Sequence, residues 1–253
     1  MKAKLPLQLL GFLLLCPVVA LGQMQVTLNR NTSSYSFGDG GEFRAMAGGT
    51  PNLVTAIDGS AYSPLTSGMI SGQFYFQTFC IEINENFTPG TPYNVTISPN
   101  AMYGSQPPGG DPVSVGTAWL YSQFAAGTLV GLTAGNVPTP YDYIYGAGRV
   151  ASAGQLQQAI WWLEREPFVY PDTTDPGSGN VFRNAVLNQF GGSVLAARAD
   201  ANGAYGVRAL NLGNPGALQD QLVIVPQVPE PATASMALLG LGMLLFLRQN
   251  PRS

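Results

Sequence analysis

The side chains that could do chemistry in this chain are few, because its 253 residues include no histidine. This absence excludes Ser-His-Asp and Cys-His catalysis, and it excludes zinc and haem sites with imidazole ligands. Both lysines, Lys2 and Lys4, stand at the start of the chain, so the remainder has no amine for Schiff-base chemistry. Carboxylates, tyrosines, a thiol or a metal held by oxygen atoms remain as options. No motif indicates a metal or a cofactor, and we expect neither.

Cys80 is the thiol to consider, because the other cysteine, Cys16, lies in an apolar segment at the start of the chain. An unpaired cysteine in an exported protein cannot form an internal disulfide and is a candidate reactive group. Cys80 stands in the motif Thr78-Phe79-Cys80-Ile81-Glu82, near the end of a predicted strand. A second motif, Leu156-Gln157-Gln158-Ala159-Ile160-Trp161-Trp162, lies on a predicted helix.

These two motifs together resemble the Cys-Gln thioester domains of bacterial surface proteins. In that family a cysteine early in the domain forms an internal thioester with the glutamine of a Gln-x-Ala-Ile-Trp motif. By position Cys80 matches the thiol partner and Gln157 the amide partner, while Gln158 occupies the variable place. The resemblance covers roughly residues 76–166 with gaps, and it implies a β-sandwich or barrel with an inserted helical part.

The chemistry that this resemblance implies needs no histidine. A thiolate at Cys80 would attack the side-chain carbonyl of Gln157 and expel ammonia, which stores an acyl group. Phe79, Trp161 and Trp162 are expected to shield this bond from water, and a helix N-terminus near Gln157 is expected to offer backbone N–H groups to the oxyanion. Such a bond acylates an amine or hydroxyl of a partner once. The expected activity is therefore adhesion, and the protein is not expected to be an enzyme.

Two alternatives stay open. Cysteine is often a small buried hydrophobe, and apolar residues at helical spacing around Gln157 are ordinary core, so Cys80 can be purely structural. A secreted carbohydrate-active enzyme would instead need two carboxylates that converge in a pocket. Glu164 and Glu166 are two positions apart on the predicted helix and point about 200° apart, so we expect both on the solvated surface.

The composition favours an α+β fold that is mostly β, with 31 glycines, 20 prolines and only 10% charged residues. Strands are predicted at Met24–Leu28, Gly72–Ile81, Tyr93–Ile97 and Gln221–Val225. Helices are predicted at Val113–Phe124, which reads as amphipathic, at Ser152–Glu166 with Ser152 as the N-cap, and at Asn180–Phe190.

Residues 1–22 have the pattern of a secretory signal peptide. Lys2 and Lys4 precede an almost wholly apolar run from Leu7 to Leu21, and small residues stand where a signal peptidase reads the chain. Cleavage before Gln23 is expected. A lipoprotein acylated at Cys16 is the alternative, which the large residue before that cysteine and the proline after it disfavour.

The other end carries a second targeting segment. Pro229, Glu230 and Pro231 precede the apolar run Ala234–Leu247, and arginines follow. The run is shorter than the roughly 20 residues of a membrane span, which suits transient retention. This segment resembles the PEP-CTERM sorting signal of Gram-negative bacteria, which an exosortase recognises, often in species that make exopolysaccharide. A plain C-terminal transmembrane helix is the alternative interpretation.

The sequence therefore predicts a signal peptide at 1–22, a thioester-domain-like extracellular body at 23–226 and a sorting segment at 227–253. We expect a precursor tethered to the inner membrane by its C-terminal helix, and a mature protein at the cell surface or in the extracellular matrix. Signal peptidase and exosortase are the expected processing enzymes, and a surface protein or polysaccharide is the expected target. Acidic residues outnumber arginines in the body, so nucleic acid is not an expected partner. An inert structural protein associated with exopolysaccharide is the main alternative function.

Overall fold

The computed structural model describes residues 23–30, 36–37, 40–49, 52–102, 109–129, 143–146, 148–166, 180–213 and 218–227. Within these residues the main sheet has seven antiparallel strands in the order β11-β10-β7-β1-β4-β6-β5. The strands are β1 (Met24–Arg30), β4 (Phe43–Gly49), β5 (Ser67–Ile70), β6 (Gln73–Thr78), β7 (Pro92–Ser98), β10 (Val207–Leu212) and β11 (Gln221–Ile224). Two short hairpins pair β2 (Ser36–Phe37) with β3 (Gly40–Gly41), and β8 (Asn100–Ala101) with β9 (Asp111–Pro112).

The four strands predicted from the sequence all form, as β1, β6, β7 and β11. In β1 the side chains of Val26 and Leu28 are buried while their neighbours are partly exposed, which is the period-two pattern of a strand with one covered face. β11 is buried along its whole length, in keeping with its continuous apolar sequence. The pattern of apolar residues thus placed these strands correctly.

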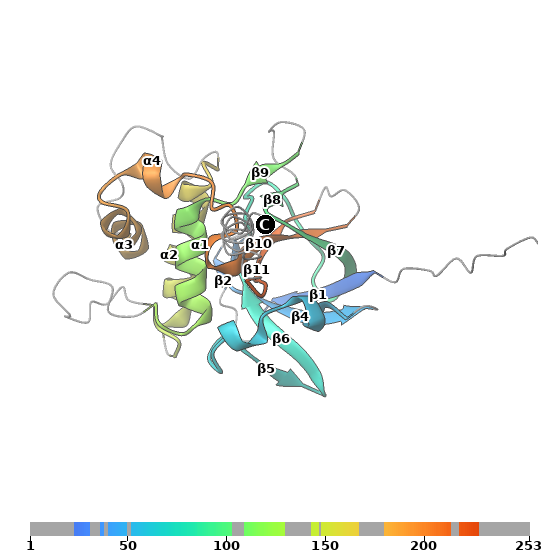
Figure 1. The fold of residues 1–253 in the computed structure, drawn as a ribbon. Helices are drawn as coiled ribbons and strands as arrows, with labels where there is room; N and C mark the ends of the chain where they lie inside the picture. The colour runs from blue at the N-terminus through green and yellow to red at the C-terminus, as the bar shows by residue number, and fades with distance from the viewer. Residues whose placement is uncertain are drawn as a thin grey trace, which may run out of the picture.

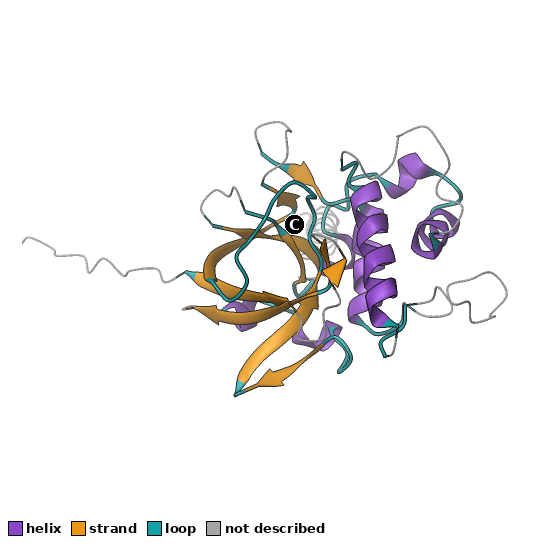
Figure 2. Cartoon of the chain, turned by 180° about the vertical axis from the view of Figure 1, so that it is seen from behind, coloured by secondary structure: helices purple, strands orange, loops and turns teal. Residues whose placement is uncertain are grey.

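The sheet is strongly curved, so that its edge strand β11 approaches the segment that follows β6 (Figure 2). The N–H of Leu222 in β11 donates to the carbonyl of Phe79 at 3.1 Å, and the N–H of Ile81 donates to the carbonyl of Asp220 at 3.0 Å. Cys80 and Gln221 form an isolated bridge between these segments. The strand that carries Cys80 is therefore hydrogen-bonded to the last strand of the sheet.

Among the described residues, four α-helices lie at one side of this sheet, with α3 and α4 on the outside of α1 and α2 (Figure 1). They are α1 (Val115–Ala125), α2 (Arg149–Leu163), α3 (Val181–Gln189) and α4 (Val194–Ala197). Short 3-10 turns occupy Leu53–Ala56, Gly59–Ala61 and Ala204–Gly206. The predicted helix at Asn180–Phe190 corresponds closely to α3, because Asn180 caps it and Gly191 and Gly192 follow it with positive φ.

The predicted start of the helix at Ser152 is wrong. α2 begins one turn earlier, at Arg149, and its N-cap is Gly148 with φ at 99°. The Ser152 hydroxyl instead accepts a hydrogen bond from the N–H of Ile144 at 3.0 Å, from inside the helix. The serine therefore ties the preceding segment to α2 rather than opening the helix.

The helix predicted at Val113–Phe124 is present as α1, but it is not amphipathic. Ser114 caps it, and the residues buried along it cover all sides of the helix. α1 is packed against α2, α3, α4 and β10, which leaves it little contact with solvent. A helix enclosed in this way is apolar all round.

The prediction of a mostly β fold is confirmed, while the prediction of a β-sandwich or barrel is wrong for the residues that the structure describes. They form one curved, open antiparallel sheet with helices at one side. Pattern alone gives strand positions but not their pairing order, which here joins β1 to β4 and β7. The predicted signal peptide at 1–22 and the apolar run after Pro231 lie outside the described residues. Among the helices that are described, none is both long and apolar enough to cross a membrane.

Candidate functional site

Cys80 and Gln157 meet where α2 packs against the segment that follows β6. The Sγ–H of Cys80 donates to Oε1 of Gln157 at 3.1 Å. Cys80 follows β6, and Gln157 lies two turns into α2. The two residues are far apart in the sequence, and the fold brings them together. Both side chains are fully buried, with 0% exposure. The fold thus places a thiol directly against a carboxamide in a water-free position.

Three backbone groups fix the orientation of the Gln157 amide. Its Oε1 accepts from the N–H of Gly41 at 3.1 Å and from the N–H of Cys80 at 3.3 Å. Its Nε2 donates to the carbonyl of Cys80 at 2.8 Å. If the oxygen and nitrogen of this amide were exchanged, the NH₂ group would face the N–H donors of Gly41 and Cys80, and the oxygen would face the carbonyl of Cys80. The amide therefore has one orientation in which its hydrogen bonds are satisfied. The two N–H groups that hold Oε1 form a donor pair of the kind that stabilises an oxyanion.

The N–H of Gly41 is brought to Gln157 by a close approach of β3 to α2. A Cβ built on Gly40 would lie 2.5 Å from Cη2 of Trp161 and 2.8 Å from Cγ of Gln157. Only glycine leaves room for such a contact. Gly41 has φ at 105°, a conformation that also favours glycine. Sequence reasoning missed this pair, because two adjacent glycines do not stand out among 31.

A buried ion pair locks β3 to the start of α2. Arg149 donates from Nε to Oε2 of Glu42 at 2.8 Å and from Nη2 to Oε1, with both side chains almost fully buried. The hydroxyl of Tyr143 also donates to Oε2 of Glu42. Glu42 follows Gly41, and Arg149 begins the helix that carries Gln157. The ion pair therefore helps to hold the N–H of Gly41 against Oε1 of Gln157.

The environment of the thiol keeps it protonated. Burial raises the pKa of Cys80 well above its ordinary value, and the nearby carboxyl groups of Glu82 and Glu166 raise it further. The backbone N–H of Cys80 and the indole N–H of Trp161 act in the opposite direction. Because the thiolate is the nucleophile, attack on Gln157 requires removal of the thiol proton during the reaction.

The predicted shielding residues separate into two groups. Trp161 packs with Cys80 and Phe43 in a small apolar cluster, which Ile83 and Phe87 adjoin. Phe79 and Trp162 belong instead to the main core. Side chains alternate along the strand, so Phe79 faces away from its neighbour Cys80.

Phe79 and Trp162 have partners of their own in the main core. Phe79 packs edge-on to Phe124 with ring centroids 5.0 Å apart. The guanidinium groups of Arg183 and Arg198 lie over the Trp162 ring. The apolar cover of the thiol therefore comes from Trp161 and from residues that the sequence did not mark.

The predicted contribution of a helix N-terminus to the oxyanion is wrong. Gln157 lies in the middle of α2, eight residues after its start at Arg149. The N–H groups that contact Oε1 of Gln157 are instead those of Gly41 and Cys80. Gly41 belongs to the β2–β3 hairpin and Cys80 to the segment after β6, so spacing along the helix cannot reveal either donor.

Within the described residues, Asp220, Glu85 and Glu166 lie close to Glu82, which follows Cys80 by two positions. Glu82 is 4% exposed, and neither of its oxygens has a hydrogen-bond partner in the described part of the chain. Burial raises its pKa to about 10, and repulsion from Asp220, Glu85 and Glu166 adds to the effect. Burial likewise raises the pKa of Glu85 to about 8 and that of Asp220 to about 7. Within the described ranges no group of such residues has an arrangement that could hold a metal ion.

Glu164 is buried, contrary to the prediction of a solvated surface residue, and Glu166 is only partly exposed. Glu166 accepts from the N–H of Ile83 at 3.0 Å. Glu164 is 7% exposed and accepts from the hydroxyl of Ser114 at 2.8 Å, at the start of α1. Its partner lies far away in the sequence, so spacing on one helix could not predict this burial.

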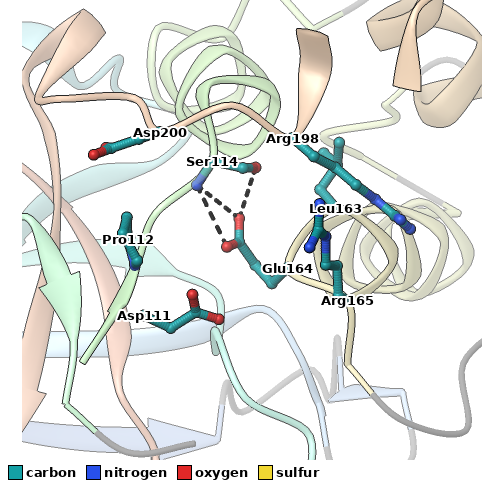
Figure 3. Close-up of a pocket in the computed structure, with 8 residues that line it drawn as sticks. All are labelled: Asp111, Pro112, Ser114, Leu163, Glu164, Arg165, Arg198 and Asp200. Carbon is teal, nitrogen blue, oxygen red and sulfur yellow. Dashed lines mark hydrogen bonds between the residues drawn. The ribbon is translucent and has the colours of Figure 1, made fainter. Parts of the chain in front are cut away.

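Glu164 lines a cavity of about 150 Å³, in which its carboxylate turns toward Ser114 (Figure 3). Asp111, Arg165 and Arg198 also line this space. Burial raises the pKa of Glu164 to about 7, and hydrogen bonds from Thr117 and Ser114 oppose the shift. The cavity therefore holds one acid that exchanges its proton near neutral pH.

Comparison with known proteins bears on the end of the chain. Residues 227–252 match the PEP-CTERM protein-sorting motif, which confirms the prediction for this segment, including Pro229, Glu230 and Pro231. These three residues lie outside the described part of the structure. No curated protein and no solved structure matches the chain significantly. The motif indicates an exported protein that is sorted by an exosortase and is anchored at the membrane before processing.

Proposed function

We propose that this exported protein forms an internal thioester between Cys80 and Gln157 and uses it to attach covalently to a partner at the cell surface or in the extracellular matrix. The observation that carries the proposal is the buried contact of 3.1 Å between Sγ of Cys80 and Oε1 of Gln157. The oxygen in this contact is the one that both backbone N–H groups hold. The sorting motif supports the exported location in which such a bond would act.

The hydrogen bonds around Gln157 suit an acyl transfer. When sulfur attacks the side-chain carbon, negative charge develops on Oε1, where the N–H groups of Gly41 and Cys80 already point. Such donors are in place before the reaction and need no reorganisation. The burial of both reacting groups keeps water from the product.

The target of the stored acyl group is an amine or a hydroxyl on a surface protein or polysaccharide. The chain after Lys4 contains no lysine, so the body has no ε-amine that could discharge the bond within itself or between copies. Reaction with a partner would leave that partner joined to the Gln157 side chain and release the Cys80 thiol.

Intact mass tests the proposal on the exported protein, isolated without reducing agents or added amines. We expect methylamine to add one molecule to the wild type and none to Cys80→Ala, which carries the same processed ends. We also expect the untreated wild type to be lighter by one ammonia than Cys80→Ala after correction for the substitution. Equal masses without a methylamine adduct would refute the thioester.

The alternative is an inert structural protein of the exopolysaccharide matrix, in which Cys80 is part of the core. The complete burial of the thiol and its raised pKa favour this interpretation, because both reduce reactivity. Labelling of thiols in unfolded protein separates the two functions. A thiol that reacts in full after unfolding supports the inert protein, and one that stays blocked supports the thioester.

A carboxylate-dependent enzyme is a further candidate, and the Glu164 cavity is the feature that favours it. Glu164 is buried and its pKa is raised to about 7, so it can carry a proton near neutral pH, as a general acid needs. Asp111 lines the same cavity. Polysaccharide hydrolysis by the wild type that is lost in Glu164→Gln would support this function. Its absence from the wild type would exclude the enzyme for the polysaccharides tested.

A further inference from the structure

The residue expected at the start of the exported body has both parts of a self-modification. The sorting motif indicates an exported protein, and the signal-peptide pattern of residues 1–22 predicts cleavage before Gln23. Cleavage there turns the backbone nitrogen of Gln23 into an α-amine. This amine and the side-chain amide of the same residue can then close a five-membered ring of N, Cα, Cβ, Cγ and Cδ.

The structure leaves the reacting end of Gln23 outside the sheet. β1 begins at Met24, which pairs with Gly49 of β4. Gln23 is exposed and belongs to no strand. Its backbone carbonyl lies close to Gly49, because a Cβ built on that glycine would be 2.4 Å from this oxygen. The sheet therefore holds the chain from the carbonyl of Gln23 onward, and ring closure would change only atoms that precede it.

The chemistry of ring closure needs only what Gln23 itself supplies. An α-amine has an ordinary pKa of about 7.7–8.0, so part of the population is uncharged and nucleophilic at neutral pH. Well-oriented groups within one molecule react at effective concentrations of about 10⁵ M or more. The side chain of Gln25, in contrast, lies beside a backbone amide that is no nucleophile, and its Nε2 donates to Oδ1 of Asn94 at 3.0 Å.

We propose that Gln23 of the exported protein cyclises to pyroglutamate. The bond between the α-nitrogen and Cδ forms, and the bond between Cδ and Nε2 breaks. The proton that the amine loses leaves with Nε2, so ammonia is the one product besides the ring. The step needs no oxidant, cofactor or second reactant. The ring nitrogen is an amide, which carries no charge and does not act as a nucleophile.

The modification removes the last primary amine from the body. Both lysines, Lys2 and Lys4, leave with the signal peptide, and the arginines stay protonated. The role of this loss rests on the proposed function, whereas the modification itself does not. A thioester reacts with amines. Exported molecules without an amine cannot consume one another's thioesters before they meet a partner.

The amine that matters for the thioester is that of another copy of the chain. β1 has seven residues, which span roughly 20 Å at about 3.3 Å each. Its far end, Arg30, pairs with Phe43, and Phe43 packs with Cys80. Gln23 therefore lies about one strand length from the thiol of its own chain, out of reach of that bond. The N-terminus of a second molecule in solution has no such restraint.

Amine labelling of the exported protein tests the modification. Freshly isolated wild type is denatured and acetylated with a succinimidyl ester at near-neutral pH, and trypsin then releases the first peptide, which ends at Arg30. We expect this peptide to carry no acetyl group and to be lighter by one ammonia, with the loss placed at Gln23 by fragmentation. Labelling at once after isolation limits ring closure during preparation.

Two variants provide the comparison. Gln23→Ala cannot form the ring, so its first peptide should carry one acetyl group. Gln25→Ala is the matched control, because it changes an exposed glutamine of the same peptide and should stay blocked like the wild type. An acetylated wild-type peptide would overturn the proposal, as would a mature chain that begins at a residue other than Gln23.

A second experiment tests the role in protecting the thioester. Gln23→Ala keeps one α-amine per molecule, so a concentrated sample should form covalent dimers that survive denaturation and that the wild type lacks. Cys80→Ala, added to this variant, should abolish them. A methylamine adduct on Gln23→Ala without any dimer refutes the protective role. A blocked first peptide in a wild type that takes up no methylamine refutes the thioester and supports the modification.

Discussion

Gly40→Ala tests the close approach of β3 to α2 on which the geometry at Gln157 depends. The added Cβ would lie 2.5 Å and 2.6 Å from two ring atoms of Trp161 and 2.8 Å from Cγ of Gln157. Carbon atoms in contact prefer about 3.5 Å or more, so these side chains must move by roughly 1 Å. Trp161 is 5% exposed and its ring is rigid, so the ring cannot make room by moving into solvent.

The expected loss of stability is that of an overpacked core, about 1–3 kcal/mol. For a protein of this size such a loss lowers Tm by roughly 2–10 °C. A displacement of about 1 Å in a reacting group can also slow a reaction by around 100-fold, so we expect slower ammonia loss. Thermal melting and intact mass of the same preparations measure the two effects.

Gly48→Ala is the matched control, because a Cβ at Gly48 meets its nearest atom at 3.6 Å, an ordinary contact. This variant should melt within a degree or two of the wild type and react at the wild-type rate. If Gly40→Ala behaves in the same way, the packing of β3 on α2 has been described incorrectly.

Three further predictions concern stability. Arg149→Met removes the opposite charge from the buried carboxylate of Glu42 and should cost about 3–5 kcal/mol in urea unfolding. Glu42→Gln should recover part of this loss in the double variant, and no recovery would contradict the ion pair. Gln157→Ala removes the acceptor of two buried backbone N–H groups and should cost about 1–3 kcal/mol for each in the same assay, while an unchanged midpoint would count against those hydrogen bonds. The folded-state pKa values of Asp220 and Glu85, about 7 and about 8, lie above the ordinary values of 3.8 and 4.5. Their stabilising contribution is complete below the ordinary values and is lost as pH rises through the folded ones, so Tm should fall between about pH 5 and about pH 8, and a rise would refute the acidic cluster.

The sequence was sufficient to predict several of the individual elements and one contact, and insufficient for the framework around them. Apolar patterning located β1, β6, β7 and β11, because each buries a face or its whole length. The motifs around Cys80 and Gln157 singled out two residues that the structure brings to 3.1 Å.

Other features depended on contacts between distant segments, which local patterns do not contain. Gly41 acts through the one hydrogen bond that its N–H donates to Gln157. Glu164 is buried because Ser114 satisfies its charge, and the two are far apart in the sequence. The open sheet differs from the expected sandwich or barrel because strand order is set by packing, which the strand sequences leave undetermined.

The position of β11 determines how the molecule carries a mechanical load. β11 ends at Ile224, just before the sorting motif begins at residue 227, and it is hydrogen-bonded to β10 on one side and to the segment around Cys80 on the other. Tension between an anchored tail and a partner held at Gln157 would therefore pass through this one strand. It would act on several backbone hydrogen bonds at once, and the first strand to be pulled from the sheet would be the one that supports the thiol.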